Sequence, residues 1–190
     1  MDNGFQEIDT AIYKTARERY LPQKIKYLIV AESPPAFKGD KPTAYFYFSD
    51  VPKADSLFYS MVYALFDFEF SKSIYDREKV LTLFKDNGFY LIDAVDYPIN
   101  KDKEFNHIDD SMRKMIIKEN KARFESHLES LISRGNLDKS TKTILIKETV
   151  YSQYSNHPLL NVLNTKYIGF PTCSIDRKFA KIVRELVFNN

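Results

Sequence analysis

The chain has 190 residues, of which 44% are hydrophobic and 28% are charged, and its formal net charge is +2. This length suits one domain with a full hydrophobic core, because domains usually contain about 100–200 residues. No apolar run approaches the roughly 20 residues of a membrane span, and the first residues, MDNGFQEID, are acidic where a secretory signal would be basic. We therefore expect a single domain over residues 1–190, cytoplasmic and without a membrane partner.

The residues of metal and cofactor sites are sparse. Cys173 is the only cysteine, and a single thiol can form neither an internal disulfide nor an all-cysteine metal or iron–sulfur cluster. The three histidines, His107, His127 and His157, do not stand at metal-ligand spacing and are interpreted as surface residues. The glycine-rich phosphate loops of nucleotide-hydrolysing and dinucleotide-binding enzymes are also missing. The sequence predicts no metal and no cofactor.

The first predicted elements are a helix and a buried strand. Four apolar side chains recur at helical spacing, Phe5, Ile8, Ile12 and Ala16, and predict a helix over residues 4–20. The apolar run at 27–31 then predicts a parallel strand buried on both faces. An irregular segment over 32–52 follows and contains four consecutive aromatic residues at 45–48. A connection of this length is usually functional.

Helices and strands alternate through the rest of the chain. Predicted helices over 54–68 and 76–86 precede a strand at 89–95, and a long helix over 110–134 precedes a strand at 143–147. A helical stretch over 150–163 and a strand at 166–170 follow, and Ser174 is predicted to cap a terminal helix. Four strands separated by helices predict an α/β protein, a three-layer α/β/α sandwich around a four-stranded parallel sheet.

Acidic side chains stand at the carboxyl ends of the predicted strands. Glu32 follows the first strand, Asp93 and Asp96 close the second, and Glu148 follows the third. Parallel strands end at one edge of a sheet, where ligands bind, so we expect these carboxylates to share a cleft with the aromatic run. Crowded carboxylates shift one another's pKa values apart, which suits general acid–base chemistry or divalent metal binding.

Several of these residues have a structural alternative. Glu148 can favour the dipole of the helix that follows it, and Asp96 can close an Asx-type turn. The aromatic run at 45–48 serves equally well as a hydrophobic plug. The basic residues of the helix over 110–134 are interpreted as its solvated face. Glu32 and Asp93 are the strongest candidates, because a carboxylate buried beside a core strand is costly unless it is paired or used.

The order of these motifs resembles that of the uracil-DNA glycosylase superfamily. The stretch AESPP at 31–35 is similar to the Gly-Glu-Ala-Pro-Gly motif of one branch. The aromatic run stands where the family has a base-stacking ring, and Asp93 stands where it has an Asn that reads the base edge. The sequence FPT at 170–172 replaces a His-Pro-Ser turn, and the iron–sulfur cysteines of that branch are absent.

This resemblance implies a divergent DNA glycosylase, which extrudes a damaged or deaminated base and hydrolyses its N-glycosidic bond. The implied catalytic residues are Glu32, as the water-positioning carboxylate, and Asp93. The implied base-binding residues are Ser33, Tyr45, Phe46, Tyr47 and Asp96. The implied phosphate-binding residues are Thr172, Ser174 and Lys178, near the start of the terminal helix. DNA is the implied partner.

Two other functions stay open at this point. One is a catalytically inactive nucleic-acid or nucleotide-binding module of the same fold, since the histidine of the last motif is missing. The other is a metal-dependent phosphoester hydrolase, in which Glu32, Asp93 and Glu148 supply oxygen ligands to Mg²⁺.

Overall fold

The four-stranded parallel sheet predicted from the sequence is present. The structure is a computed structural model, and it describes residues 10–38, 41–42, 44–50, 55–67, 76–102, 104 and 106–189. The strands lie in the order β4 (Phe89–Asp93), β1 (Tyr27–Ala31), β5 (Lys142–Leu145) and β6 (Asn161–Val162). All three neighbouring pairs are parallel. Two short strands, β2 (Phe37–Lys38) and β3 (Lys41–Pro42), form a separate antiparallel pair within the segment expected to be irregular.

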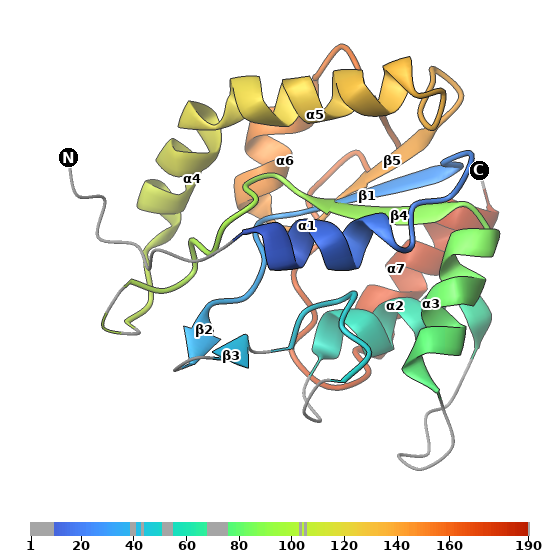
Figure 1. Cartoon of the computed structure of the whole chain (residues 1–190), viewed down its shortest axis with the longest axis horizontal. Coiled ribbons are helices and arrows are strands. Elements are labelled where there is room, and N and C mark those ends of the chain that lie inside the picture. Colours follow the sequence, from blue (N-terminus) through green and yellow to red (C-terminus); the bar gives the residue numbers. More distant parts are fainter. Residues whose placement is uncertain are drawn as a thin grey trace.

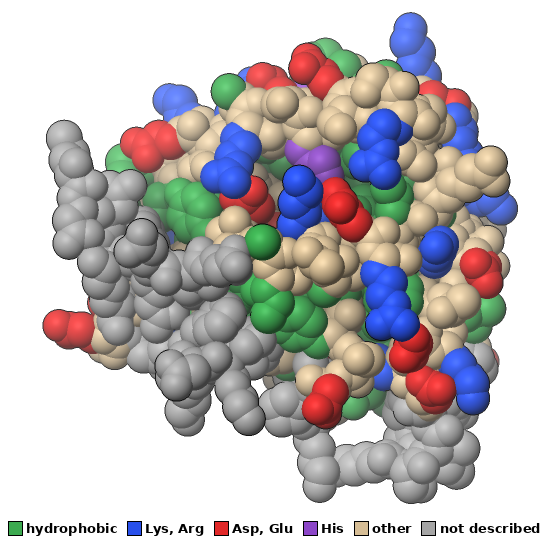
Figure 2. All heavy atoms as spheres, viewed as in Figure 1, with side chains coloured by type: hydrophobic (Ala, Val, Ile, Leu, Met, Phe, Trp, Pro, Cys, Tyr) green, Lys and Arg blue, Asp and Glu red, His purple; other side chains and the backbone are tan. Residues whose placement is uncertain are grey.

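Helices cover both faces of the sheet, which makes the three-layer α/β/α arrangement (Figure 1). One layer contains α2 (Ser56–Phe66), α3 (Arg77–Asp86) and α7 (Arg177–Phe188). The other contains α4 (Asp110–Glu119), α5 (Lys121–Ser133) and α6 (Glu148–Tyr154). The helix α1 (Ala11–Glu18) lies beside β4, and charged side chains gather over α1 and α5 on the face shown in Figure 2. Among the helices of the described ranges, none is long and apolar enough to cross a membrane.

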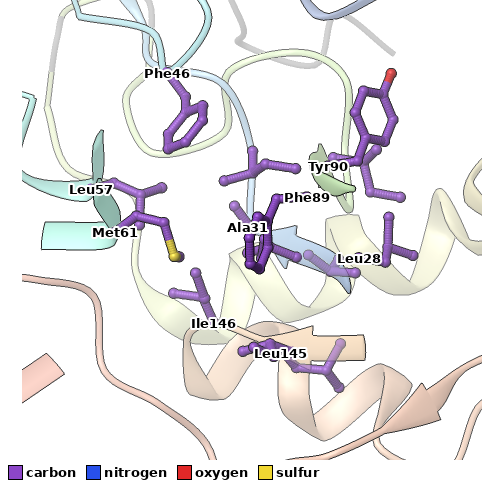
Figure 3. Close-up of a cluster of buried hydrophobic side chains, with 14 of the residues drawn as sticks. Leu28, Ala31, Phe46, Leu57, Met61, Phe89, Tyr90, Leu145 and Ile146 are labelled. Atoms are coloured by element: carbon purple, nitrogen blue, oxygen red, sulfur yellow. The ribbon is translucent and has the colours of Figure 1, made fainter. Parts of the chain in front are cut away.

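The strands are buried on both faces because helices flank the sheet on both sides. Every residue of β4 is buried, and so are the last four of β1, so neither strand shows a polar alternation. Figure 3 shows side chains of β1, β4 and β5 packing with Leu57 and Met61 of α2 and with Phe46. The core therefore extends from the sheet to the aromatic run that follows the first strand.

Aspartates cap most of the long helices. The side chains that accept a hydrogen bond from the first helical turn are those of Asp55, Asp76, Asp109 and Asp176, before α2, α3, α4 and α7. Such caps satisfy backbone N–H groups that have no partner inside the helix. The prediction that Ser174 caps the terminal helix is therefore wrong, because Asp176 accepts from Phe179 at 3.0 Å in that place.

The long helix predicted over 110–134 is two helices, α4 and α5, which meet at Asn120. The Asn120 backbone leaves the helical region, with φ −88° and ψ 4°. Its side-chain amide donates to the Ile116 carbonyl at 2.9 Å and to the Tyr97 hydroxyl at 3.0 Å. The sequence did not reveal the break, because apolar residues recur at helical spacing on both sides of it.

The edge strand differs most from the prediction. The helical stretch over 150–163 ends at Tyr154, and β6 occupies Asn161–Val162. From the strand predicted at 166–170, only Ile168 pairs with the sheet, as a single bridge to Ile146. Between the two pairings, the buried Asn164 side chain accepts from Leu145 N at 3.0 Å and donates to Leu145 O at 3.1 Å. A side-chain amide thus replaces one step of the backbone ladder.

The first helix is shorter and faces differently than predicted. Within the described residues it begins at Ala11, while Phe5 and Ile8 lie outside them. Ile12 is 41% exposed, whereas Tyr13 and Arg17 are buried. A buried arginine on this face was not predicted, because Arg17 interrupts the apolar pattern.

Candidate functional site

A pocket of about 290 Å³ lies at the carboxyl ends of β1 and β4. Ala31 and Asp93 are paired in register, so Glu32 and Asp93 emerge side by side from neighbouring strands. The predicted residues that line this pocket are Glu32, Ser33, Tyr45, Phe46 and Asp93. Further lining residues include Asn100, His107, Arg113, Lys147 and Phe170. The expected meeting of two carboxylates and an aromatic segment at one sheet edge is thus present.

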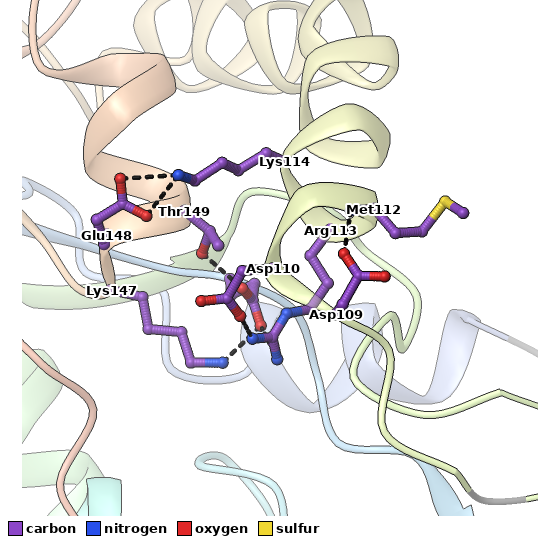
Figure 4. Close-up of polar contacts among 9 residues, drawn as sticks. Asp109, Asp110, Met112, Arg113, Lys114, Lys147, Glu148 and Thr149 are labelled. Carbon is purple, nitrogen blue, oxygen red and sulfur yellow. Dashed lines mark hydrogen bonds and ion pairs between the residues drawn. The ribbon is translucent and has the colours of Figure 1, made fainter.

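Glu32 is buried and surrounded by partners, and three of these, Arg113, Lys147 and Thr149, are labelled in Figure 4. Its Oε2 lies 2.6 Å from Lys147 Nζ and 3.6 Å from an Arg113 guanidinium nitrogen. Its Oε1 accepts a hydrogen bond of 2.5 Å from the Thr149 hydroxyl. Two cations and a hydroxyl therefore compensate the burial of this carboxylate.

Lys147 reaches Glu32 from a strained backbone. Its φ of 72° and ψ of 149° belong to a region that is essentially restricted to glycine. The backbone N–H of Lys147 donates to Ile168 O at 2.7 Å, and its carbonyl accepts from Tyr151 at 3.0 Å in the first turn of α6. These bonds fix the conformation that turns the side chain toward the pocket. Strain of this kind is often found at functional sites.

Arg113 enters the pocket from the first turn of α4. Its guanidinium pairs with Asp110, and its side chain is only 16% exposed. The interpretation of this residue as part of a solvated helix face is wrong, because the start of α4 is directed at the sheet edge. Arg113 Nε is buried and has no hydrogen-bond partner among the described residues. Arg113 thus adds a second cation, beside Lys147, to the pocket wall.

Asp93 is the less strongly paired of the two carboxylates. It is buried, and the Tyr45 hydroxyl donates to its Oδ2 at 3.5 Å. Burial raises the pKa of Asp93 to about 7, while the charge of Arg17 and the hydrogen bond from Tyr45 oppose that rise. Near neutral pH, Asp93 therefore exists in both forms, as a hydrogen-bond donor and as an acceptor.

The aromatic run divides between the pocket and the core. Tyr45 and Phe46 line the pocket, and Arg77 holds this turn by donating to both of their carbonyls at 3.1 and 3.0 Å. Tyr47 is not among the described residues that line it. Its hydroxyl accepts from Leu91 N at 2.7 Å and donates to Leu91 O at 3.1 Å. The expectation that Tyr47 binds the base is corrected, because its hydroxyl anchors the run to β4.

The other predicted site residues lie elsewhere. Asp96 pairs with Arg123 at 2.7 Å, and Glu148, the first residue of α6, pairs with Lys114 at 2.7 Å. The predicted phosphate-binding residues Thr172, Ser174 and Lys178 are exposed and outside the described lining of the pocket. The Asp176 carboxylate already accepts the Thr172 and Phe179 backbone N–H groups. A phosphate there would meet this negative charge, which disfavours anion binding at the helix start.

Sequence reasoning missed five polar pocket residues, Asp55, Asn100, His107, Arg113 and Lys147. Lys147 could have been found, because it ends a predicted strand, as Asp93 does. Arg113 could not, because its direction depends on where α4 begins and ends. His157 is not a surface residue as expected: it is buried, and its Nε2 lies 3.0 Å from Glu125 Oε1.

Comparison of the chain with protein-family models, with curated proteins and with solved structures finds no match. The described residues include no group of three or more His, Cys, Asp or Glu side chains placed to hold a metal ion. The ligand set of the metal-dependent alternative is not assembled, because Glu148 is directed toward Lys114 (Figure 4). The chemistry of the pocket is therefore inferred from its own side chains.

Proposed function

We propose that the pocket at the ends of β1 and β4 binds an extruded, damaged or deaminated base in DNA and hydrolyses its N-glycosidic bond. The observation that carries this proposal is the meeting of Glu32, Asp93 and the Tyr45–Phe46 turn around one pocket of about 290 Å³. The resemblance to uracil-DNA glycosylases assigns the same three features to water, base edge and base stacking.

Glu32 suits the charge that develops during this reaction. The transition state is oxocarbenium-like, so a nearby ionised carboxylate stabilises it electrostatically. The contacts with Lys147 and Thr149 fix the position of Glu32 before substrate arrives. This arrangement favours electrostatic stabilisation, because the carboxylate cannot reorient during the step.

Asp93 suits recognition of the base edge. Its protonated form donates to a base carbonyl or ring nitrogen, and its ionised form accepts from an exocyclic amine. Since the pKa of Asp93 is about 7, both forms are populated near neutrality. We expect base preference to depend on pH in this range, unlike that of an Asn at the same position.

A non-catalytic base-binding module is the second candidate, and one observation favours it. Both oxygens of Glu32 already have close partners, Lys147 on one side and Thr149 on the other. A carboxylate held in this way supports the shape of a binding pocket without activating water. The two candidates share the same pocket and differ only in whether the base is released.

The test uses oligonucleotides that each carry one damaged or deaminated base, followed by alkaline cleavage at abasic sites. The matched variants are Glu32→Gln and Glu148→Gln, because both glutamates pair with a lysine but only Glu32 lines the pocket. We expect base release by the wild type and by Glu148→Gln, and its loss in Glu32→Gln. Base binding without release by the wild type would favour the module. Neither binding nor release of any base would reject both candidates.

A further inference from the structure

A second pocket, of about 330 Å³, lies between α1 and α5. Its walls come from one face of each helix and from the segment 93–96 that follows β4. Within the part of the chain that the structure describes, only Asp93 is common to this pocket and the one at the ends of β1 and β4. In Figure 2, Lys and Arg side chains gather on this face over α1 and α5.

Among the described residues, four cationic and three acidic side chains line this second pocket. Lys14 and Arg17 come from α1, and Arg134 follows α5. The Arg123 charge is compensated by Asp96 at 2.7 Å, and the other acidic lining residues are Glu18 and Asp93. Lys14, Arg17 and Arg134 form no ion pair with any residue in the described parts of the chain. Among the described residues, these three cations thus have no ion-pair partner within 4.0 Å, and the nearest acidic influence on Arg17 is the charge of Asp93.

Arg17 is the residue that makes this pocket unusual. Only 6% of the residue is exposed, and its Nε is buried without a hydrogen-bond partner in the described structure. A buried guanidinium N–H left unpaired is costly, and its planar fork matches the oxygens of a phosphate group. The Arg17 side chain lines the pocket, so a phosphate bound there would place hydrogen-bond acceptors beside a buried cation.

The pKa of His127 also reflects the positive charge of this pocket. Burial and the nearby charges of Arg17, Lys14 and Arg134 lower the pKa of His127 to about 4. The ring is therefore neutral at physiological pH and can donate one N–H to a bound anion. A phosphate beside it would raise the pKa of His127, since an opposite charge favours the imidazolium.

We propose that the pocket between α1 and α5 binds the phosphate group of a small ligand, with Arg17, Lys14 and Arg134 as its cationic partners. The recess and the buried guanidinium suit free phosphate or a nucleoside monophosphate, which can enter completely. A continuous nucleic-acid strand would instead have to follow the outer surface. This inference does not depend on the glycosidic reaction.

Calorimetry with inorganic phosphate and with a nucleoside monophosphate tests the proposal and separates the two sources. The Lys14→Gln/Arg134→Gln variant removes two exposed cations without altering the buried Arg17, so the fold is retained. We expect saturable binding that this variant weakens by at least about tenfold, because each charged hydrogen bond is worth more than 1.4 kcal/mol. The matched control, Lys118→Gln/Lys139→Gln, removes two exposed cations outside the pocket and should bind as the wild type does.

Nuclear magnetic resonance of the histidine rings gives a second readout. Phosphate should raise the pKa of His127 and leave the exposed His107 unchanged. Equal weakening in both double variants, an unshifted His127, or binding of an oligonucleotide but of neither small ligand would overturn the proposal. None of these measurements uses base release, so a failed glycosylase assay and a failed phosphate site are distinguishable.

Discussion

Lys147 places its Nζ 2.6 Å from Glu32 Oε2 while its own backbone stands at a φ of 72°. A residue with a Cβ normally avoids this region, and the strain amounts to about 1–3 kcal/mol. At Lys147 the ion pair therefore stabilises the fold, while the strained backbone destabilises it.

Lys147→Gly and Lys147→Ala separate these two contributions. Both variants lose the ion pair with Glu32, but only glycine relieves the strained φ. We expect Lys147→Gly to be more stable than Lys147→Ala by about 1 kcal/mol in urea unfolding. At Lys142, inside β5, the order should be reversed because glycine weakens a regular strand. If Lys147→Ala were as stable as Lys147→Gly or more stable, Lys147 would not be strained.

Glu32→Gln should destabilise the fold more than Glu148→Gln does. The change leaves Lys147 and Arg113 beside a neutral amide in a buried place, which costs about 2–3 kcal/mol. Glu148 and Lys114 are 43% and 35% exposed, so that pair contributes at most about 1 kcal/mol. Denaturant midpoints at pH 7 measure both. Equal losses would mean that Glu32 is not held by its cations.

Asp93 should make the fold less stable as the pH rises. The folded-state pKa of about 7 lies above the ordinary 3.8, so the folded chain holds this proton more tightly than the unfolded chain. The resulting stability is fully present below pH 3.8 and is lost as the pH rises toward 7, by at most about 4 kcal/mol. Asp93→Asn should therefore be more stable than the wild type at pH 8 and close to it at pH 4. Thermal unfolding at the two pH values checks this, and a constant difference would contradict it.

Asn164→Ala should destabilise the sheet edge. The change removes both hydrogen bonds to Leu145 and leaves a buried N–H and C=O without partners, which costs about 2–4 kcal/mol. Asn161→Ala is the matched control, because Asn161 is an exposed residue of β6. Urea unfolding should show a large loss for the first and almost none for the second. Hydrogen exchange at Leu145 N–H should become faster only in Asn164→Ala.

The strands buried on both faces were predictable from the sequence, and so was the side of the sheet on which Glu32 and Asp93 meet. A continuous apolar run indicates a strand buried on both faces, and a carboxylate at its end indicates the edge of the sheet where ligands bind. Both signals lie within a few neighbouring residues. The break at Asn120 and the ladder role of Asn164 were not predictable, because each depends on partners distant in the chain, Tyr97 and Leu145. Of the two cationic partners of Glu32, Arg113 was unpredictable for the same reason, whereas Lys147 stands at the end of a predicted strand.

The position of Asp93 in the walls of both pockets has one more consequence. The Asp93 carboxyl, which binds one proton, lies between the two pockets. Arg17 acts on it from the pocket between α1 and α5, and Tyr45 contacts it from the pocket at the ends of β1 and β4. An anion that draws the guanidinium toward itself strengthens the hold of Asp93 on that proton. Binding at the proposed phosphate site would therefore be expected to raise the pKa of Asp93 and so to change the hydrogen bonding in the other pocket.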